Sequence, residues 1–402
     1  MIDRKTVCII TGTRAEYGLL RPLIDKILVD DIFDLRLVAT GSHLSTAFGE
    51  TYHEIENDGY TIHAKIKMAL DSDTHAGMAR ATGSVIVAFT DYFETHRPDM
   101  LIVLGDRFEL LAAAIAASIL CIPIAHIAGG DTSEGAIDEF IRHSITKMSY
   151  LHFPTNEQSL RRIIQLGETP ERVFNVGALN IDNIVSRPLL SIDELSMNLG
   201  FDLDGEYALI TYHPVTMRED SAVADFTELL NSIDCFPNMK YLFTKANADS
   251  GGRAINAILD KFVVSRQNCM AHASLGNLRY LSAMKHAFFV IGNSSSGLYE
   301  TPIFGIPCIN IGDRQRGRLR AENVIDCPPE KKAIEAAINQ ARGGKFRAIA
   351  KKVVNPFGDG NSAEKISEKI NHYLQTDNID LTKSFYVPSV FLAFQANSRG
   401  IT

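Results

Sequence analysis

The sequence lacks the cysteine spacing of a metal site or of a disulfide framework. Its six cysteines are scattered without a CxxC pair, and several lie in apolar runs. This distribution predicts buried free thiols in a reducing compartment. Histidines in HExxH spacing are missing as well, and we therefore expect neither a metal ion nor a cofactor.

Long apolar runs and an excess of basic charge are also missing. No stretch reaches the roughly 18 apolar residues that a membrane-spanning helix needs, and the N-terminus has no cleavage-site pattern. The formal net charge of -8 argues against a nucleic-acid-binding surface. With 46% hydrophobic and 22% charged residues over 402 positions, the chain is expected to be soluble, cytoplasmic and long enough for two domains.

What the sequence does contain is an alternation of short apolar runs with amphipathic segments. Residues 15–30 and 107–120 carry apolar side chains at helical spacing. Apolar strands that alternate with helices predict parallel sheets covered on both faces. We expect strands at residues 7–11, 35–40, 100–105, 122–129, 151–156, 173–179, 207–214, 240–247, 287–296 and 307–313.

A polar, turn-rich stretch interrupts this alternation near residue 186. We expect an N-terminal Rossmann-like domain at 1–185, a C-terminal one at 186–375, and a tail at 376–402 that packs back on the first domain. The predicted fold class is therefore α/β, with two doubly wound domains that face a cleft. Ligands bind such sheets outside the carboxyl ends of the strands, so polar residues directly after a strand are the candidate site residues.

Polar residues follow three predicted strands of the first domain. Arg14 opens the helix after the first strand, where a helix N-terminus and a guanidinium favour phosphate. His43 lies on the loop after the second strand, and Asp106, Arg107 and Glu109 follow the third. Simpler interpretations remain open: a surface arginine, a solvated histidine and, at Asp106, a helix cap. Capping does not explain why an arginine and a second acid follow Asp106.

The segment 'HIAGGDTSEGAIDEFIRH', residues 126–143, brings a cluster of acids to the end of another strand. The acids are Asp131, Glu134, Asp138 and Glu139. Asp138 and Arg142 are four positions apart and would form an ordinary pair on a helix surface. A solvated surface explains Glu139 well. It explains Asp131 and Asp138 less well, because both lie near the strand end.

In the second domain, His213 and Asn247 lie at the ends of two predicted strand segments. Residues 292–297, 'GNSSSG', link a further strand to a helix. The backbone N–H groups and serine hydroxyls of such a segment form an anion-binding nest. Glu300 lies one turn later, where a carboxylate binds the two hydroxyls of a ribose. A serine-capped helix is the simpler alternative, although three serines exceed what a cap needs.

A run of arginines follows the next predicted strand. Taken alone, such a run is usually solvated, but beside the serine segment it is interpreted as a clamp for a diphosphate. The arginines are Arg314, Arg316, Arg318 and Arg320.

Taken in this order, the motifs resemble those of the hydrolysing UDP-N-acetylglucosamine 2-epimerases of nonulosonate (sialic-acid-type) biosynthesis. The resemblance covers most of the chain, from residue 11 to about residue 360, and rests on 'TGTRAEYG', 'TGSHL', 'GDRFE', 'DEFIRHSITK', 'HPVT', 'GNSSSG', 'NIGDRQRGR' and 'NPFGDGN'. It implies a GT-B-like fold and a homo-oligomer, a dimer or tetramer, that binds a UDP-sugar. The implied reaction converts UDP-N-acetylglucosamine and water to UDP and N-acetylmannosamine. It proceeds by anti elimination to a glycal and by water addition that inverts C2.

The resemblance also implies roles for individual residues. Asp106 and Asp138 line the sugar site, and we add His43, Arg107 and Glu134 to it. His213 is counted both with the catalytic candidates and with the nucleotide site. The nucleotide is assigned to Arg14, His213, Asn247, Ser294, Ser295, Glu300 and Arg314.

One position departs from the family pattern. Related epimerases commonly carry an acid directly after the 'HI' or 'HV' at this strand end, where this chain has Ala128. Asp131 is interpreted as the substitute and is therefore counted with Asp106 and Asp138 as a catalytic candidate.

Other functions remain open on the sequence. The same reaction on UDP-2,4-diacetamido-trideoxyglucose, on the legionaminic-acid route, requires only a different pocket around sugar C4 and C6. A non-hydrolysing epimerase is disfavoured because its 'HVEAGLR'-like stretch is missing. The acids at the strand ends argue against a GT-B glycosyltransferase, since transfer of a sugar does not require deprotonation at C2. They also argue against an inactive UDP-sugar sensor.

Overall fold

The computed structural model describes residues 4–46, 49–68, 74–132, 137–214, 222–246, 252–376 and 379–388. The chain divides into two units, unit 1 formed by residues 1–186 and 357–402, and unit 2 formed by residues 187–356. The first boundary lies one residue from the expected one. Within these described ranges, no helix is long and apolar enough to cross a membrane.

Unit 1 is built on a parallel six-stranded sheet. Its strands are β1 (Lys5–Thr11), β2 (Phe33–Thr40), β3 (Ile62–Ile66), β4 (Met100–Leu104), β5 (Ile124–Ile127) and β6 (Leu151–Phe153). They lie in the order β3-β2-β1-β4-β5-β6. The direction in which successive strands are added reverses between β1 and β4, so the crevice expected at a topological switch point lies at their carboxyl ends.

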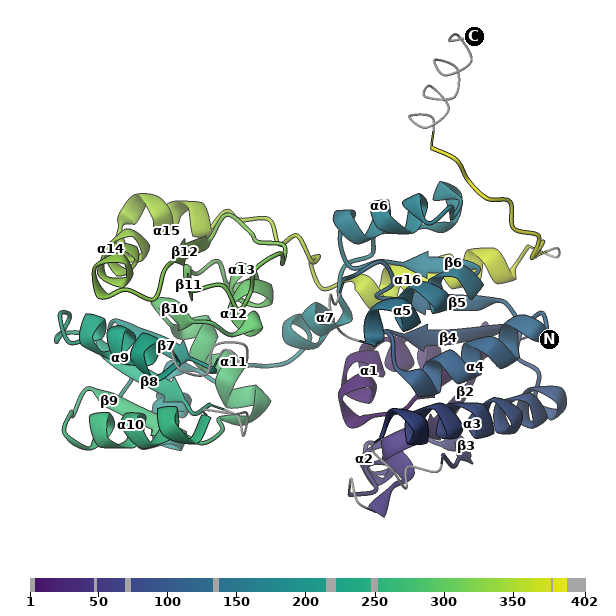
Figure 1. Cartoon of the computed structure of the whole chain (residues 1–402), viewed down its shortest axis with the longest axis horizontal. Coiled ribbons are helices and arrows are strands. Elements are labelled where there is room, and N and C mark those ends of the chain that lie inside the picture. The colour runs from purple at the N-terminus through teal and green to yellow at the C-terminus, as the bar shows by residue number, and fades with distance from the viewer. Residues whose placement is uncertain are drawn as a thin grey trace, which may run out of the picture. The chain divides into compact units, whose positions relative to one another are not determined.

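Helices cover both faces of this sheet (Figure 1). One face packs against α1 (Arg14–Val29), α2 (Tyr52–Asn57), α7 (Leu179–Val185) and α16 (Ser362–Leu374). The other packs against α3 (His75–Thr95), α4 (Phe108–Ile119) and α5 (Asp138–Met148). Shorter elements are η1 (Gly41–Leu44), α6 (Glu157–Gln165) and η3 (Pro170–Arg172).

Helix α16 was expected in the second domain but belongs to unit 1. Its apolar face, with Ile366 and Ile370 among other residues, enters the core under α1. The carboxylate of Asp182, on α7, accepts hydrogen bonds from the first backbone amides of α16, Ser362 N at 3.1 Å and Ala363 N at 2.7 Å. An amphipathic pattern does not state which sheet a helix covers, which is why the sequence misplaced this boundary.

The described part of the tail also lies against unit 1. Tyr386 N donates to Gly167 O at 3.0 Å, and Lys383 Nζ forms an ion pair with Glu168 Oε2 at 2.6 Å. The same lysine donates to Lys147 O and Ser149 O, at the carboxyl end of α5. The tail therefore contacts α5, the helix whose first residue is Asp138.

Unit 2 repeats the strand connectivity of unit 1. Its strands are β7 (Tyr207–Thr211), β8 (Lys240–Thr244), β9 (Cys269–His272), β10 (Phe289–Gly292), β11 (Cys308–Ile311) and β12 (Val324–Cys327). They lie in the order β12-β11-β10-β7-β8-β9, again in parallel pairs. The switch point of this sheet therefore lies between β7 and β10.

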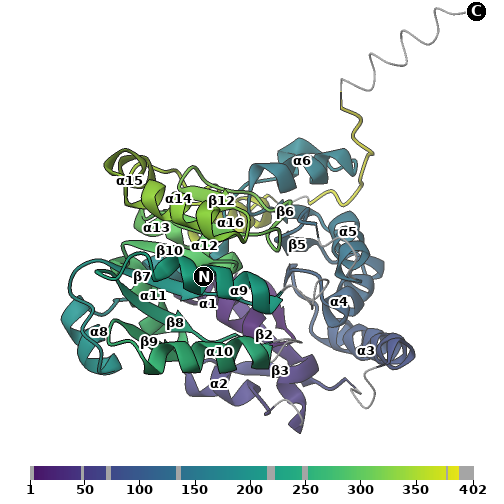
Figure 2. The ribbon, with the colours of Figure 1, turned by 60° about the vertical axis from the view of Figure 1, so that its left-hand side comes forward.

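Two helical layers sandwich the sheet of unit 2 (Figure 2). One face packs against α9 (Ala222–Ile233), α10 (Gly252–Val264) and α14 (Lys331–Arg342). The other packs against α8 (Ile192–Leu199), α11 (Gly276–His286) and α13 (Thr301–Phe304). The remaining helices are α12 (Ser295–Tyr299) and α15 (Gly344–Ala350).

The predicted strands differ from the observed ones in two ways. The strand expected at 173–179 is wrong, because Val173 makes only an isolated bridge to His152 and α7 begins at Leu179. Strands β3, β9 and β12 were missed because each is short, lies at or next to a sheet edge and carries polar residues. All six cysteines are free thiols, and Cys121 and Cys235 are exposed.

Candidate functional site

Asp106 lies at the switch point of unit 1, directly after β4. The turn begins at Gly105, whose φ of 86° is in the region that glycine tolerates best. The carbonyl of Gly105 accepts a hydrogen bond from Nε2 of His126 at 2.7 Å, and burial lowers the pKa of His126 to about 3. This histidine is therefore a neutral, fully buried support for the turn that presents Asp106.

A buried arginine fixes the Asp106 carboxylate. Arg142, on α5, donates from Nη2 to Asp106 Oδ2, and its Nη1 donates to Asp131 O at 2.8 Å. The side chain of Arg142 is 8% exposed. Helix α5 thus ties the loop after β4 to the loop after β5, as expected for two motifs at neighbouring strand ends.

Asp138 and Arg107 lie beside this pair. Asp138 is the first residue of α5 and is exposed. Burial lowers the pKa of Arg107, but the charges of Glu109, Glu16 and Asp138 outweigh burial and leave it above its usual value. The structure therefore brings Asp106, Arg107 and Asp138 to one edge of the sheet, together with Arg142.

Asp131 has its carboxylate turned toward α6. The hydroxyl of Ser159 donates to Asp131 Oδ1, and Asn156 Nδ2 lies 3.4 Å from the same oxygen. Burial raises the pKa of Asp131 above its usual range, against the opposing effect of these hydrogen bonds. In this arrangement the side chain anchors the loop after β5 to the start of α6. Ala128, the position at which the family resemblance implies an acid, has a left-handed φ of 60°.

His43 and Arg14 make contacts that the sequence did not indicate. The His43 ring is fully buried, with Nε2 3.0 Å from Thr11 Oγ1 and Nδ1 2.8 Å from Thr51 Oγ1. It supports the loop after β2 instead of presenting a solvated ring. Arg14 Nε forms an exposed ion pair with Glu54 Oε2 at 2.8 Å. Glu134, the remaining predicted sugar-site residue of this unit, lies outside the described residues.

In unit 2 the loop after β7 is held by an asparagine from the loop after β10. His213 N donates to Asn293 Oδ1 at 2.7 Å, and Asn293 Nδ2 donates to His213 O at 2.7 Å. Asn293 N also bonds to Thr211 O at 3.1 Å. His213 and the serine segment are therefore neighbours across the switch point. Asn293, which we did not predict as a site residue, is the residue that joins them.

The serine segment leads into a half-buried polar network. Ser294 and Ser295, at the start of α12, are partly exposed. Ser296 Oγ donates to Glu300 Oε2 at 2.7 Å and lies 2.8 Å from the hydroxyl of Tyr280. Burial raises the pKa of Glu300 to about 7, and the Ser296 hydrogen bond opposes that rise. Glu300 thus changes charge near neutral pH.

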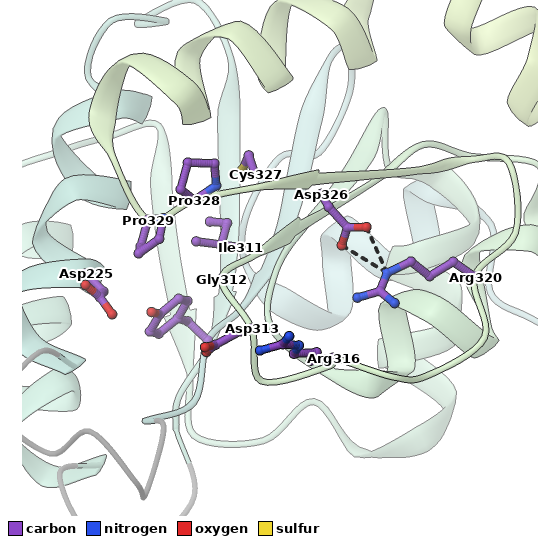
Figure 3. A pocket seen from close by; sticks show the side chains of 11 residues that line it. Asp225, Ile311, Gly312, Asp313, Arg316, Arg320, Asp326, Cys327, Pro328 and Pro329 are labelled. Atoms are coloured by element: carbon purple, nitrogen blue, oxygen red, sulfur yellow. Dashed lines mark hydrogen bonds and ion pairs between the residues drawn. The ribbon is translucent and has the colours of Figure 1, made fainter.

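The run of arginines after β11 divides between two places. Arg314 Nη1 donates to Asn293 O at 3.1 Å and so reaches the serine segment. Arg320 is instead bound to Asp326, with Nε 2.9 Å from Oδ2. Figure 3 shows this pair and Arg316 around a pocket of about 450 Å³ in unit 2. Arg314 and Arg320 therefore have different partners in this structure. Asn247 lies outside the described residues.

Two parallel, doubly wound sheets with polar residues at both switch points define a GT-B-like architecture of the kind found in nucleotide-sugar enzymes. The family model described as UDP-N-acetylglucosamine 2-epimerase matches residues 26–371. The chain belongs to this family, in its hydrolysing UDP-sugar 2-epimerase branch.

Known proteins similar to the chain agree with this assignment. The GDP/UDP-N,N'-diacetylbacillosamine 2-epimerase (hydrolyzing) of Campylobacter jejuni is 44% identical over 81% of this chain and 85% of that protein. The UDP-N,N'-diacetylbacillosamine 2-epimerase (hydrolyzing) of Legionella pneumophila is 34% identical over 90% and 94%. The crystal structure of UDP-GlcNAc 2-epimerase from Neisseria meningitidis bound to UDP-GlcNAc has the same fold. Its TM-score is 0.77 at 17% identity, over 91% of this chain and all of that one.

Proposed function

We propose that the chain hydrolyses UDP-N,N'-diacetylbacillosamine, a UDP-linked diacetamido-trideoxyhexose, with inversion at C2 and release of UDP. The observation that carries this choice is the 44% identity to the Campylobacter jejuni enzyme of that name. It favours the substrate that the sequence motifs left as the alternative to UDP-N-acetylglucosamine. The second candidate, UDP-N-acetylglucosamine, is favoured by the description of the family model.

Unit 2 is proposed to bind the nucleotide. The partly exposed Ser294 and Ser295 offer hydroxyls beside the start of α12, and Arg314 reaches the same segment through Asn293 O. A guanidinium and hydroxyl donors neutralise the diphosphate as it leaves. Glu300 is assigned to the ribose hydroxyls and His213 to the diphosphate side of this segment.

Unit 1 is proposed to carry out the proton transfers. Elimination of UDP requires a base that removes the C2 proton, and water addition requires a proton donor at C2 and a base for the water. Asp106, held by Arg142, and Asp138, near Arg107, are the acids offered for these steps. Asp131 is assigned to holding the loop, since its carboxylate already accepts from Ser159.

The charge of Glu300 gives a pH dependence for nucleotide binding. A carboxylate accepts two ribose hydroxyls, whereas a protonated acid accepts less well, so UDP affinity should rise as the pH passes through about 7. We expect an increase of up to about tenfold between pH 6 and pH 8, measured by isothermal titration calorimetry. Glu300→Gln is expected to bind UDP more weakly than wild type. Its UDP affinity should keep only the pH dependence that comes from the titration of UDP itself. A wild-type affinity no more pH-dependent than that of the variant would contradict this role.

The substrate is tested by supplying both nucleotide sugars to the purified chain. We expect UDP release from UDP-N,N'-diacetylbacillosamine, measured with a coupled assay. The rate of UDP release from UDP-N-acetylglucosamine is expected to be at least about a hundredfold lower. The reverse order would establish the second candidate. The GDP-linked diacetamido sugar serves as a third arm, since the Campylobacter jejuni relative is named for both nucleotides.

Isotope incorporation tests the reaction type. Elimination followed by water addition places one solvent deuteron at C2 of the released sugar, which NMR detects in D₂O. A GT-B glycosyltransferase or a simple nucleotide-sugar hydrolase would release UDP without deuterium at C2. A retained UDP-sugar with inverted C2 would instead identify a non-hydrolysing epimerase.

A further inference from the structure

Two acids of unit 1 are buried directly beneath the candidate site. Glu16 is the third residue of α1 and forms a capping box with Thr13. Its Oε2 accepts hydrogen bonds from Gly12 N at 2.7 Å and Thr13 N at 3.1 Å. A capping-box acid normally lies at the surface, but Glu16 is only 7% exposed. Its burial therefore needs a reason beyond capping.

The second acid is Glu109, in the first turn of α4. It is fully buried, and its Oε1 accepts a hydrogen bond from Arg107 Nε at 2.5 Å. The carboxyl presses against two glycines, because a Cβ atom at Gly12 would lie 2.4 Å from Oε1 and one at Gly41 would lie 2.9 Å from it. Both acids thus contact Gly12, one through its amide and the other through its Cα.

If Glu16 and Glu109 were both ionised, their negative charges would exceed the positive charge of Arg107. Arg107 is the cation that acts on Glu16, while Glu109 acts on it as a like charge. His43, on the neighbouring loop, stays neutral above pH 4, because burial lowers its pKa to about that value. Asp138 adds a further negative charge near Arg107. Among the described residues, Glu16 Oε1 and Glu109 Oε2 are buried without a hydrogen-bond partner.

We propose that Glu16 and Glu109 are positioning residues that hold one proton between them at neutral pH and thereby fix the Gly12–Thr13 backbone and the Arg107 guanidinium. Two carboxyls in one dry place do not both ionise readily, and a shared proton removes their repulsion. Arg107 and the loop after β1 then keep their places beside Asp106 and Asp138. The proposal deepens the proposed function and rests on it.

The proton gives the site an upper pH limit. Burial, and then the charge of Glu109, raise the pKa of Glu16 to about 8 from an ordinary value of 4.5. The folded chain therefore binds this proton more tightly than the unfolded chain. The contribution of Glu16 to stability falls as the pH rises from about 4.5 and levels off above about 8. Above that value Glu16 is ionised, and Arg107 and the loop are expected to lose their fixed positions.

The test compares pH profiles of kcat/KM from pH 6 to pH 10 on whichever UDP-sugar is turned over. Wild type is expected to lose activity above about pH 8. Glu16→Gln retains the capping geometry and resembles the protonated acid, so it should stay within about threefold of wild type at pH 7 and lack this alkaline loss. Glu109→Gln should lower kcat at least tenfold, because Arg107 loses a charged partner. Glu157→Gln, at an exposed position on α6, is the control and should reproduce the wild-type profile.

A second readout does not depend on activity. At pH 7 the infrared spectrum of the free protein should contain a carbonyl stretch of a buried protonated carboxylic acid that remains after the spectrum of Glu16→Gln is subtracted, so that the Glu300 signal cancels. This band should disappear above about pH 8. If this band is missing from wild type, or if Glu16→Gln keeps the alkaline loss, the shared proton is wrong. If neither UDP-sugar is hydrolysed while the band titrates as expected, the proposed function fails and the acid pair stands.

Discussion

Asp106→Asn is expected to lower kcat by about a hundredfold to ten thousandfold, the range over which a positioned acid or base contributes. Asparagine has nearly the same shape but cannot take up a proton, and its amide would direct N–H groups toward Arg142, which donates to Asp106 in the native protein. Initial rates of UDP release at saturating substrate measure the effect. UDP affinity should change little, because the proposed nucleotide contacts lie in unit 2.

Glu139→Gln is the matched control for this substitution. Glu139 also lies near Arg142, with Oε2 3.7 Å from Nη1, but it occupies the side of α5 that carries His143. Its replacement is expected to leave kcat within about threefold of wild type, as for a helix-surface pair of small energy. Asp138→Asn should behave like Asp106→Asn. Wild-type turnover in both aspartate variants would show that the reacting carboxylates are elsewhere.

Gly292→Ala is expected to have the largest effect on folding. A Cβ atom at residue 292 would lie 1.9 Å from Thr211 O, a backbone atom that cannot move without separating β10 from β7. We expect a loss of at least about 3 kcal/mol in the free energy of unfolding of unit 2. Urea titration followed by circular dichroism would show the transition of unit 2 at lower urea, with weaker UDP binding wherever the unit still folds.

Gly344→Ala serves as its control within the same unit. Gly344 begins α15, and no described heavy atom lies within 4 Å of a Cβ placed there. Alanine at this position should leave the transition unchanged or move it to slightly higher urea, because alanine has the better helix propensity. Equal unfolding midpoints for Gly292→Ala and the control would mean that β7 and β10 are farther apart than this structure has them.

Much of the fold could be predicted because short stretches of the sequence contain the patterns of apolar strands and amphipathic helices. The apolar runs before Asp106 and His213 are strands, of which β4 ends at Leu104 and β7 at Thr211, so both residues lie at switch points. Helix α1 begins at Arg14, the residue that was expected to open it. Residue types at strand ends thus pointed to the switch point of each unit.

Side-chain direction could not be predicted in the same way. Nothing local indicates that Asp131 turns toward Ser159, or that His43 is buried between two threonines, because those partners are distant in sequence. Glu16 had a readable signal, the Thr-x-x-Glu spacing of a capping box, but its burial depends on Glu109. The separation of Arg314 from Arg320 likewise depends on Asp326, which follows on β12.

The return of the chain to unit 1 after residue 356 sets the order in which the protein can fold during its synthesis. A ribosome releases residues 187–356 before it has made α16, which contributes Ala363, Ile366, Ile370 and Leu374 to the core of unit 1. Unit 2 can therefore complete its folding first, although it comes second along the chain. Until α16 emerges, α1 and α7 leave apolar surface uncovered, and surface of this kind is prone to aggregation before folding is complete.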